Sequence, residues 1–305
     1  MTTSEARRTP VRALIVALRP RQWMKNVVVF AALVLTGQLG DPELTAATIE
    51  AFVLFCAASS SVYLINDLVD VKQDRLHPKK RLRPLAAGEL EPIVALVVAL
   101  VLGAAAVLGG FSMSVPMGGV IVAYLLLQMA YTFFLKHIVI VDVLTIAGGF
   151  VLRTLAGGVA IGSPISPYLY LSVIFLALFQ GFSKRRHELR SLSHVAASHR
   201  PSLDEYTTAI LDQFIVISAA ATVVTYSLYA ITTPQRPAGI SANMLLLTIP
   251  FILYAVFRYL FLVQVREEGG TPEEMLLSDL PLLLSVVAWA ASLLIILYVL
   301  PRTGG

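Results

Sequence analysis

Long apolar runs recur from one end of this 305-residue chain to the other, and they restrict it to membrane-embedded folds. Hydrophobic residues make up 57% of the sequence and charged residues only 14%, with a mean hydropathy of +0.79. A soluble protein carries about 25% charged residues and has no core large enough for this much apolar surface. The composition therefore excludes a soluble enzyme, a disordered chain and a nucleic-acid-binding protein, and it predicts a polytopic membrane protein.

Nine of these runs are long enough to cross a bilayer as helices. They cover roughly residues 23–39, 44–66, 92–111, 116–135, 138–162, 166–183, 210–232, 242–263 and 280–300. A spanning β-strand needs only about 9–11 residues of alternating pattern, so runs of this length favour helices. We therefore expect an all-α integral membrane protein in which residues 1–305 form one domain of nine transmembrane helices.

The basic residues indicate how the bundle is oriented. If the N-terminus is placed in the cytoplasm, only Arg236 and Arg302 of the 23 lysines and arginines fall on the opposite side, and Arg153 and Arg258 fall within predicted spans. Cytoplasmic segments of membrane proteins are enriched in Lys and Arg. This predicts a multi-pass protein of the inner (plasma) membrane. Its cytoplasmic parts are the N-terminal segment 1–20 and loops at about 66–91, 136–138 and 183–209.

Oxygen-bearing side chains are concentrated just after the second predicted span. Asn66, Asp70 and Asp74 are spaced four residues apart, and Asp67 lies close to them. On a helix, each step of four residues turns only about 40° further, so these side chains form one stripe. Such hard oxygen ligands suit Mg²⁺, which commonly bridges to a substrate phosphate. The alternative is a solvated helix end whose charges pair with neighbouring cations, but clustered polar groups at a membrane helix end favour a functional site.

Basic residues follow this stripe directly and recur in the other cytoplasmic segments. The candidates for contact with phosphate groups are Lys25, Lys79, Arg81, Arg83, Lys136, Lys184, Arg185, Arg186 and His187, and Glu188 stands beside the last of them. Lys and Arg bind phosphate oxygens, so next to a metal site they predict a pocket for a metal–phosphate complex. Membrane topology and attraction to anionic lipid explain part of this charge, but they do not explain the adjoining acids.

One further cation, Arg153, falls in the middle of the predicted span 138–162. An unpaired arginine at this depth in a bilayer is costly, so we expect it to face the interior of the bundle and to find partners there. Glycines on either side of it in the sequence permit close packing of neighbouring helices.

These motifs resemble the landmarks of the UbiA superfamily of intramembrane prenyltransferases. The sequence Asn66-Asp67-x-x-Asp70-x-x-x-Asp74-Arg75 is similar to the first aspartate motif of that family. Arg19-Pro-x-x-Trp23-x-Lys25-Asn26 and Tyr131-x-x-x-Leu135-Lys136 match other landmarks, and the resemblance covers nearly the whole chain. It implies a nine-helix bundle with a cytoplasm-facing active-site cavity, in which Mg²⁺ lies between the substrate and the carboxylates.

The chain departs from the family pattern after the span predicted at 166–183. Typical members carry a second Asp-x-x-x-Asp motif there, but this chain reads Lys184-Arg185-Arg186-His187-Glu188. In this it resembles a branch that moves 5-phosphoribose from phosphoribosyl diphosphate to a polyprenyl (decaprenyl) phosphate, on the route to the arabinose donor of the cell wall. More phosphate groups need more cations and tolerate fewer carboxylates, which agrees with the departure.

The resemblance and the phosphate chemistry together imply a role for each candidate. Asn66, Asp70 and Asp74 are expected to hold Mg²⁺ with Asp67 in support. Lys79, Arg81 and Arg83 are expected to bind the donor phosphates, and Lys184, Arg185, Arg186 and His187 the second anionic group. Glu188 is expected to orient the ribose or the metal, and Lys25 and Lys136 to bind the remaining phosphate.

Two other functions stay open on the sequence alone. One is an ordinary prenyltransferase that uses a prenyl diphosphate donor and an aromatic or apolar acceptor. The other is a transporter, which would place ionisable residues near the bilayer midplane and often shows inverted repeats. Here the acids cluster at one end and no repeat is visible. The sequence leaves open the lipid chain length, the number of metal ions and whether the chain forms a homo-oligomer.

Overall fold

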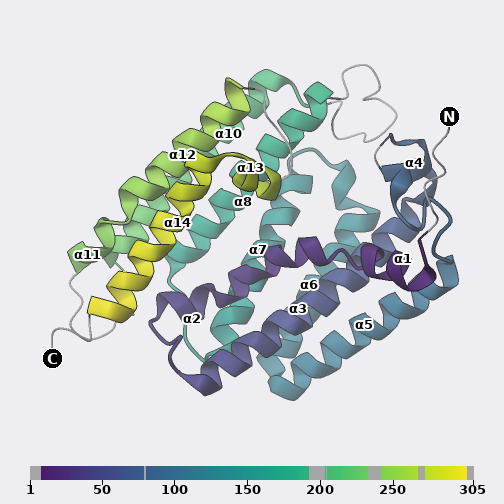
Figure 1. Ribbon diagram of the computed structural model, residues 1–305, viewed down its shortest axis with the longest axis horizontal. Helices are drawn as coiled ribbons and strands as arrows, with labels where there is room; N and C mark the ends of the chain where they lie inside the picture. The colour runs from purple at the N-terminus through teal and green to yellow at the C-terminus, as the bar shows by residue number, and fades with distance from the viewer. Residues whose placement is uncertain are drawn as a thin grey trace.

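The computed structural model describes residues 8–78, 80–191, 203, 205–232, 242–266 and 272–300, and every regular element in these ranges is helical (Figure 1). The expected all-α membrane class is confirmed, because seven helices are long and apolar enough to cross a membrane. Five of them are single helices: α3 (Pro42–Val69), α5 (Pro92–Met113), α6 (Val115–Phe133), α7 (Val141–Ala160) and α10 (Thr208–Thr232). The sixth is the stretch Met244–Gln264, which contains part of α11 (Ala242–Leu246) and all of α12 (Ile249–Gln264). The seventh is the stretch Leu280–Val299, which consists of α14 (Leu280–Leu294) and the π-helical η5 (Ile295–Val299).

The two other predicted spans differ from simple apolar helices. The span predicted at 166–183 belongs to α8 (Pro167–Ser191), which continues through the basic residues that we expected in a loop. The span predicted at 23–39 is broken into the 3₁₀ helix η1 (Pro20–Phe30) and the short α2 (Ala31–Leu35), and α1 (Pro10–Ala17) precedes them. Arg19, whose φ is 55°, separates α1 from η1, and η1 passes into α2 after Phe30.

Capping residues and prolines fix where several helices begin. Asp41 precedes Pro42, and its carboxylate accepts hydrogen bonds from the backbone N–H groups of Glu43 and Leu44 at 2.9 and 3.1 Å. Ser114 and Asp279 cap α6 and α14 in the same manner. Proline suits the first turn because the N–H that it lacks would have no partner there. The turn residues that separate the apolar runs in the sequence therefore also set the helix boundaries.

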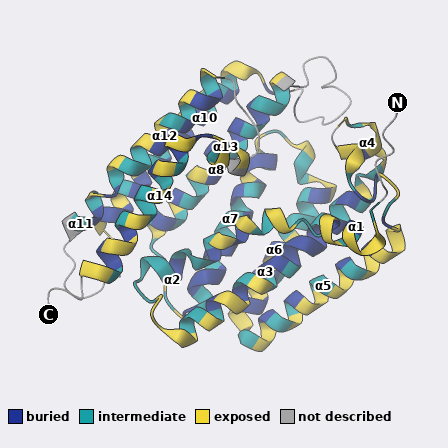
Figure 2. Ribbon diagram, viewed as in Figure 1, coloured by how far each residue is buried: buried dark blue, intermediate teal, exposed yellow. Residues whose placement is uncertain are grey.

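Helices that follow one another in the chain pack side by side. Contacts join α3 to α5, α5 to α6, α6 to α7, α7 to α8 and α8 to α10, while η1 packs between α3 and α7. In Figure 1, α10, α12 and α14 form one side of the bundle and α3, α5 and α6 form the other. Buried residues face other helices, whereas α5 exposes apolar residues such as Leu100 and Val101 on its outer face (Figure 2). An apolar outer surface suits contact with lipid.

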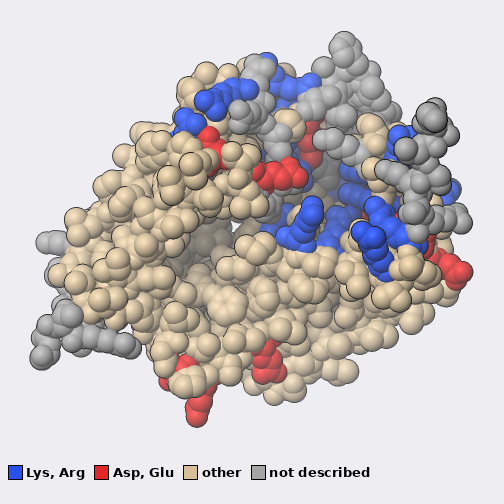
Figure 3. All heavy atoms as spheres, in the orientation of Figure 1, with Lys and Arg blue, Asp and Glu red and all other residues tan. Residues whose placement is uncertain are grey.

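Charge is distributed unevenly along the bundle. On the face drawn in Figure 3, lysines and arginines surround a hollow at the end near α4 (Val71–Leu76), where some acidic side chains lie beside them, and other acidic side chains lie at the opposite end. Two short 3₁₀ helices, η2 (Lys80–Leu82) and η3 (Leu135–His137), contribute basic residues, and α13 (Pro272–Ser278) precedes α14. The polar chemistry of the molecule is therefore concentrated at one end of an apolar bundle.

Candidate active site

A cavity of about 280 Å³, called the polar cavity below, lies among these basic side chains. Its lining residues are Arg19, Gln22, Lys25, Tyr63, Asn66, Asp70, His77, Lys80, Arg83, Tyr131, Lys136, Ile146, Lys184, Arg185, Glu188 and Leu203. Seven of these are lysine or arginine and two are acidic. The described wall therefore carries an excess of positive charge, which favours anionic ligands.

Asn66 and Asp70 present oxygen ligands at this wall. The Oγ1 of Thr132 on α6 donates a hydrogen bond to Asn66 Oδ1 at 2.5 Å, which fixes the orientation of the amide. Lys136 in η3 donates from Nζ to Asp70 Oδ1 at 2.7 Å. One amide oxygen and one carboxylate are thus held at the end of α3, each by a partner from the α6–η3 segment.

Asp67 and Asp74, which belong to the same predicted stripe, have different surroundings from Asn66 and Asp70. Helix α3 ends at Val69 and α4 begins at Val71, so the helix is interrupted at Asp70. Both acids are buried, and Arg83 donates from Nη1 to Asp67 Oδ1 at 3.0 Å and to Asp74 Oδ2 at 2.6 Å. Arg19 also pairs with Asp67. These two carboxylates therefore hold Arg19 and Arg83, two of the three arginines in the described wall of the cavity.

Arg185 forms a second buried ion-pair network. Its side chain is almost completely buried, its Nε donates to Asp142 Oδ2 at 2.7 Å, and its Nη1 pairs with Glu188. The Tyr206 hydroxyl donates to Asp142 Oδ1 at 3.2 Å and accepts from the backbone N–H of Ile140 at 2.6 Å. Burial, together with the neighbouring Asp142 carboxylate, raises the pKa of Tyr206 to about 12, so the hydroxyl stays protonated. Glu188 is thus held at the cavity by Arg185.

The remaining predicted residues divide into two groups. Lys25, Lys136 and Lys184 line the polar cavity, as does Arg83. Arg186 is directed elsewhere, because its guanidinium donates to Asp212 Oδ1 at 2.6 Å and to the carbonyl of Val263 at 2.8 Å. Arg81 and His187 are not part of the described wall either, and their contact with substrate stays a prediction. Lys79 lies outside the described residues.

Several lining residues were not among the predicted site residues. Tyr63 precedes Asn66 by three positions on α3, so helical spacing from the first motif was a signal for it. Arg19 belongs to a landmark motif, and His77 and Lys80 belong to the basic run. Asp142 gave no such signal, because it lies 43 residues from Arg185 in the sequence.

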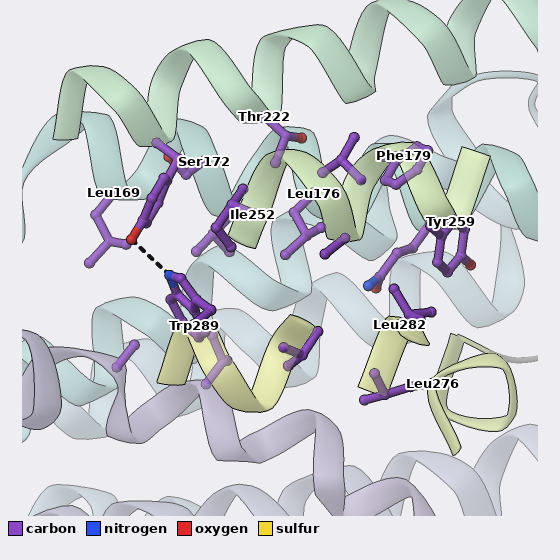
Figure 4. Close-up of a pocket in the computed structure, with 18 of the residues that line it drawn as sticks. Leu169, Ser172, Leu176, Phe179, Thr222, Ile252, Tyr259, Leu276, Leu282 and Trp289 are labelled. Atoms are coloured by element: carbon purple, nitrogen blue, oxygen red, sulfur yellow. Dashed lines mark hydrogen bonds between the residues drawn. The ribbon is translucent and has the colours of Figure 1, made fainter. Parts of the chain in front are cut away.

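A second cavity of about 370 Å³, called the apolar cavity below, lies between η1, α2, α8, α10, α12, α13 and α14. Figure 4 shows Leu169, Ser172 and Trp289 toward one end and Phe179 and Tyr259 toward the other. The indole N–H of Trp289 donates to the hydroxyl of Tyr226 at 2.7 Å, which satisfies a polar group in this wall. Most of the other lining side chains are aliphatic or aromatic, so the cavity suits a hydrocarbon chain.

Two elements, η1 and α8, contribute lining residues to both cavities. On η1, Lys25 lines the polar cavity and Val28 the apolar cavity, three residues apart. On α8, Gln180 lines the apolar cavity and Lys184 the polar cavity, which is about one helical turn. A ligand with an anionic head and an apolar tail therefore matches the order of side chains along both elements.

The oxygen ligands at the polar cavity fit a magnesium ion. Among the described residues, no cluster of three or more His, Cys, Asp and Glu side chains is placed to hold a metal. Mg²⁺ does not need such a cluster, because proteins usually hold it through one or two carboxylates while substrate phosphates and water complete its shell. Asp70 and the amide oxygen of Asn66 supply ligands of this type.

Known proteins resemble this chain over nearly all of its length. The decaprenyl-phosphate phosphoribosyltransferase of Mycobacterium tuberculosis is 37% identical over 289 residues, which cover 92% of this chain and 93% of that protein. The enzyme of the same name from Corynebacterium glutamicum is 36% identical over 294 residues, covering 94% and 87%. A UbiA homologue from Archaeoglobus fulgidus, solved bound to DMAPP and Mg²⁺, shares the fold with a TM-score of 0.72 at 17% identity, covering 94% of this chain and 99% of that one.

A match to a protein family agrees with these similarities. The UbiA prenyltransferase family matches residues 26–280, which include the residues from Asn66 to Asp74, Lys136 and the segment from Lys184 to Glu188. The resemblance seen in the motifs is thereby confirmed, and the chain belongs to the UbiA prenyltransferase family.

Proposed function

We propose that this chain transfers 5-phosphoribose from phosphoribosyl diphosphate to a polyprenyl phosphate and releases pyrophosphate. The relatives named decaprenyl-phosphate phosphoribosyltransferase support this activity, because they match nearly the whole chain. The observation that carries the proposal is the pairing of a cation-rich polar cavity with an apolar cavity along η1 and α8.

The charge of the polar cavity suits a reaction with several phosphate groups. Its described wall contains seven cations and two carboxylates. Phosphoribosyl diphosphate brings a diphosphate and a separate 5-phosphate, and the lipid brings one phosphate more. Cations compensate these negative charges, whereas further carboxylates would repel them. A prenyl diphosphate with an apolar acceptor would need fewer cations.

The positions of the side chains suggest how the substrates divide the cavity. Arg83 and Lys80 would bind the phosphates of the donor. Lys184 and Glu188, on the opposite element α8, would hold the ribose end. Lys25 would bind the lipid phosphate, because the wall of the apolar cavity begins three residues further along η1. Arg81, Arg186 and His187 have no part in this assignment, since they lie outside the described wall.

The reaction exchanges one bond at the anomeric carbon of the ribose. The bond between C1 and the diphosphate oxygen breaks, and its electron pair leaves with pyrophosphate. An oxygen of the lipid phosphate forms the new bond to C1 from the opposite face, so the configuration inverts. Lys and Arg side chains placed at the leaving group stabilise the charge that develops there. The lipid phosphate is anionic at neutral pH, so the step needs no strong general base.

Asn66 and Asp70 are the residues that would hold Mg²⁺ together with the donor diphosphate. Such an ion, when bound, neutralises negative charge on the leaving pyrophosphate. Thr132 keeps the Asn66 amide in one orientation through its hydrogen bond. Asp67 and Asp74 contribute indirectly, since they hold Arg83 at the wall.

The proposed topology places the polar cavity on the cytoplasmic side of the plasma membrane. Seven helices qualify as spans, and α8 together with the segment from α1 to α2 would complete nine crossings. The basic end of the molecule in Figure 3 would face the cytoplasm, because Lys and Arg are enriched on that side of membrane proteins. The water-soluble donor would then reach its site directly.

The test is a transfer assay with the purified chain in detergent, Mg²⁺, labelled phosphoribosyl diphosphate and a polyprenyl phosphate. We expect label in the organic phase and pyrophosphate release that depends on the lipid. Consumption of a prenyl diphosphate, with no labelled lipid formed, would replace the proposal by an ordinary prenyltransferase. Flux of the donor into proteoliposomes without any product would instead indicate a transporter.

A further inference from the structure

Arg153 is a buried cation that the proposed reaction does not use. It lies in the middle of α7, and only 5% of the residue is exposed. The hydrogen bonds of its guanidinium go to neutral oxygens: Nε to Asn26 Oδ1 at 2.7 Å, Nη2 to the Tyr124 hydroxyl at 2.8 Å and Nη1 to the Gly149 carbonyl at 3.0 Å. A charge at this depth is costly, so its presence in place of an apolar residue points to a function.

The element that Arg153 contacts is the 3₁₀ helix η1. A 3₁₀ helix of this length has poorer backbone hydrogen bonds than an α-helix, so its position depends on other contacts. Trp23 ties it to α3 by donating to Ser60 Oγ at 3.0 Å. Asn26 ties it to α3 a second time, because its Nδ2 lies 3.2 Å from Ser59 Oγ, and to α7 through Arg153.

Asn26 is fully buried on η1, between a residue that lines the polar cavity and one that lines the apolar cavity. The residue before it, Lys25, lines the polar cavity, and Val28 lines the apolar cavity. Any rotation or shift of η1 at Asn26 would therefore move both the cation and the start of the apolar wall.

We propose that Arg153 is a positioning residue for the lipid substrate. Through Asn26 it holds η1 in the place where Lys25 meets the lipid phosphate and Val28 meets the first part of the tail. This role rests on the proposed function, and it concerns the lipid acceptor and not the phosphoribosyl donor.

Kinetics of two nearly isosteric variants test the role. Arg153→Met removes the charge and keeps the length of the side chain, and Asn26→Leu removes the acceptor. Each should raise KM for the polyprenyl phosphate about tenfold, the loss expected for one charge-assisted hydrogen bond, while KM for phosphoribosyl diphosphate stays within about twofold. Both substitutions break the same contact, so their effects should not add. The KM of the double variant for the polyprenyl phosphate should be no higher than that of the more impaired single variant.

Matched variants separate positioning from folding. Thr154→Val removes a buried hydroxyl next to Arg153 that donates to the carbonyl of Phe150 in its own helix, so both KM values should stay normal. Asn26→Asp keeps an acceptor oxygen for Arg153 and should restore most of the affinity that Asn26→Leu loses.

A spectroscopic measurement reports on η1 without any activity. The chain has two tryptophans, so Trp289→Phe leaves Trp23 on η1 as the only tryptophan, and excitation at the red edge of the absorption band selects it over the tyrosines. In that background, Arg153→Met should shift the emission of Trp23 before substrate is added, and Thr154→Val should not. If the wild-type chain transferred no phosphoribose, the proposed function would fail while this shift would still establish the link from Arg153 to η1.

Three results would overturn the proposal. The first is an Arg153→Met variant with wild-type Trp23 emission and wild-type KM for the lipid. The second is an equal rise of both KM values, and the third is an additive effect of the Asn26 and Arg153 substitutions. Each of the last two would reduce Arg153 to a general contributor to the fold.

Discussion

Lys136 in η3 donates a hydrogen bond to Asp70 at the end of α3, with 2.7 Å between Nζ and Oδ1. This contact places Asp70 at the polar cavity, whereas Asp67 and Asp74 from the same motif are buried against Arg83. Three carboxylates that look equivalent in the sequence therefore have two kinds of surroundings. They should respond differently when their charge is removed.

Asp70→Asn should lower kcat/KM by about 100-fold, because it removes the carboxylate proposed to hold the metal beside the leaving group. The Asp70 side chain is 32% exposed, so its pair with Lys136 adds little stability and Tm should stay near the wild-type value. Initial rates over a range of Mg²⁺ concentrations, together with thermal unfolding, measure both effects.

Asp74→Asn is the matched control for this prediction. It removes one partner of Arg83 behind the cavity wall, so Tm should fall while the Mg²⁺ concentration for half-maximal rate stays unchanged. If Asp74→Asn raised the Mg²⁺ requirement as much as Asp70→Asn does, both carboxylates would have to bind the metal.

Asp142→Ala should lower the free energy of unfolding by about 3–5 kcal/mol, because it leaves the buried guanidinium of Arg185 without the fully buried one of its two carboxylate partners. The double variant Asp142→Leu with Arg185→Met should recover much of that stability, since it removes both charges. It should not recover turnover, because Glu188 loses the contact that holds it at the cavity. Tm and transfer rates of the three proteins are the measurement, and an unchanged Tm for Asp142→Ala would contradict the argument.

The sequence predicted the helices well where the bilayer imposes them. A segment that crosses hydrocarbon must satisfy its backbone internally, so a long apolar run with proline and a capping residue at its start specifies a helix. The segment 23–39 has the same apolar character, yet η1 is a 3₁₀ helix. The position of η1 depends on its contacts with Ser59, Ser60 and Arg153, and these residues lie far away in the sequence.

The site was predictable only in part, for a related reason. The stripe from Asn66 to Asp74 treats its acids as equivalent, but the chain returns after α4 so that Arg83 meets Asp67 and Asp74, which are buried. Arg185 and Arg186 look alike within a basic run, yet they lie about 100° apart around α8. One meets Asp142 and the other Asp212, and only the tertiary fold determines which of them reaches the cavity.

Gly157→Ala should destabilise the protein by about 2–3 kcal/mol, because a Cβ at this position would overlap the carbonyl oxygen of Val29 in η1. Gly119→Ala is the control, since no atom lies within 4 Å of the Cβ that it would add and alanine favours the helix. Thermal unfolding of both variants in the same detergent is the measurement. Equal Tm values for the two variants would show that α7 and η1 can separate without cost.

Ala255→Trp should fill part of the apolar cavity and raise KM for the polyprenyl phosphate by about tenfold or more, while KM for phosphoribosyl diphosphate stays close to wild type. Phe257→Trp on the same helix is the control, because Phe257 is exposed on the apolar outer surface. Steady-state kinetics with each substrate varied in turn measure the effect. A normal KM for the lipid in Ala255→Trp would mean that the tail binds elsewhere.

The pair between Asp279 and Arg258 should make stability depend on pH in the acid range. Arg258 donates from Nε to Asp279 Oδ1 at 3.1 Å and from Nη2 to Oδ2 at 2.7 Å. These two hydrogen bonds lower the pKa of Asp279 below its ordinary value. A carboxylate with a lowered pKa in the folded state contributes its full stability above the ordinary carboxyl pKa of about 3.9, and the contribution is lost as pH falls through the lowered pKa. Asp279→Asn keeps a residue able to cap α14 but removes the charge, so its Tm should lie below wild type at pH 5–8 (roughly the range of full ionisation), and the gap should close below about pH 4.

Asp41→Asn at the start of α3 should show a smaller gap, because Asp41 accepts its hydrogen bonds from neutral backbone N–H groups. A gap for Asp279→Asn that persisted unchanged at pH 3 would mean that the charge pair does not contribute to stability.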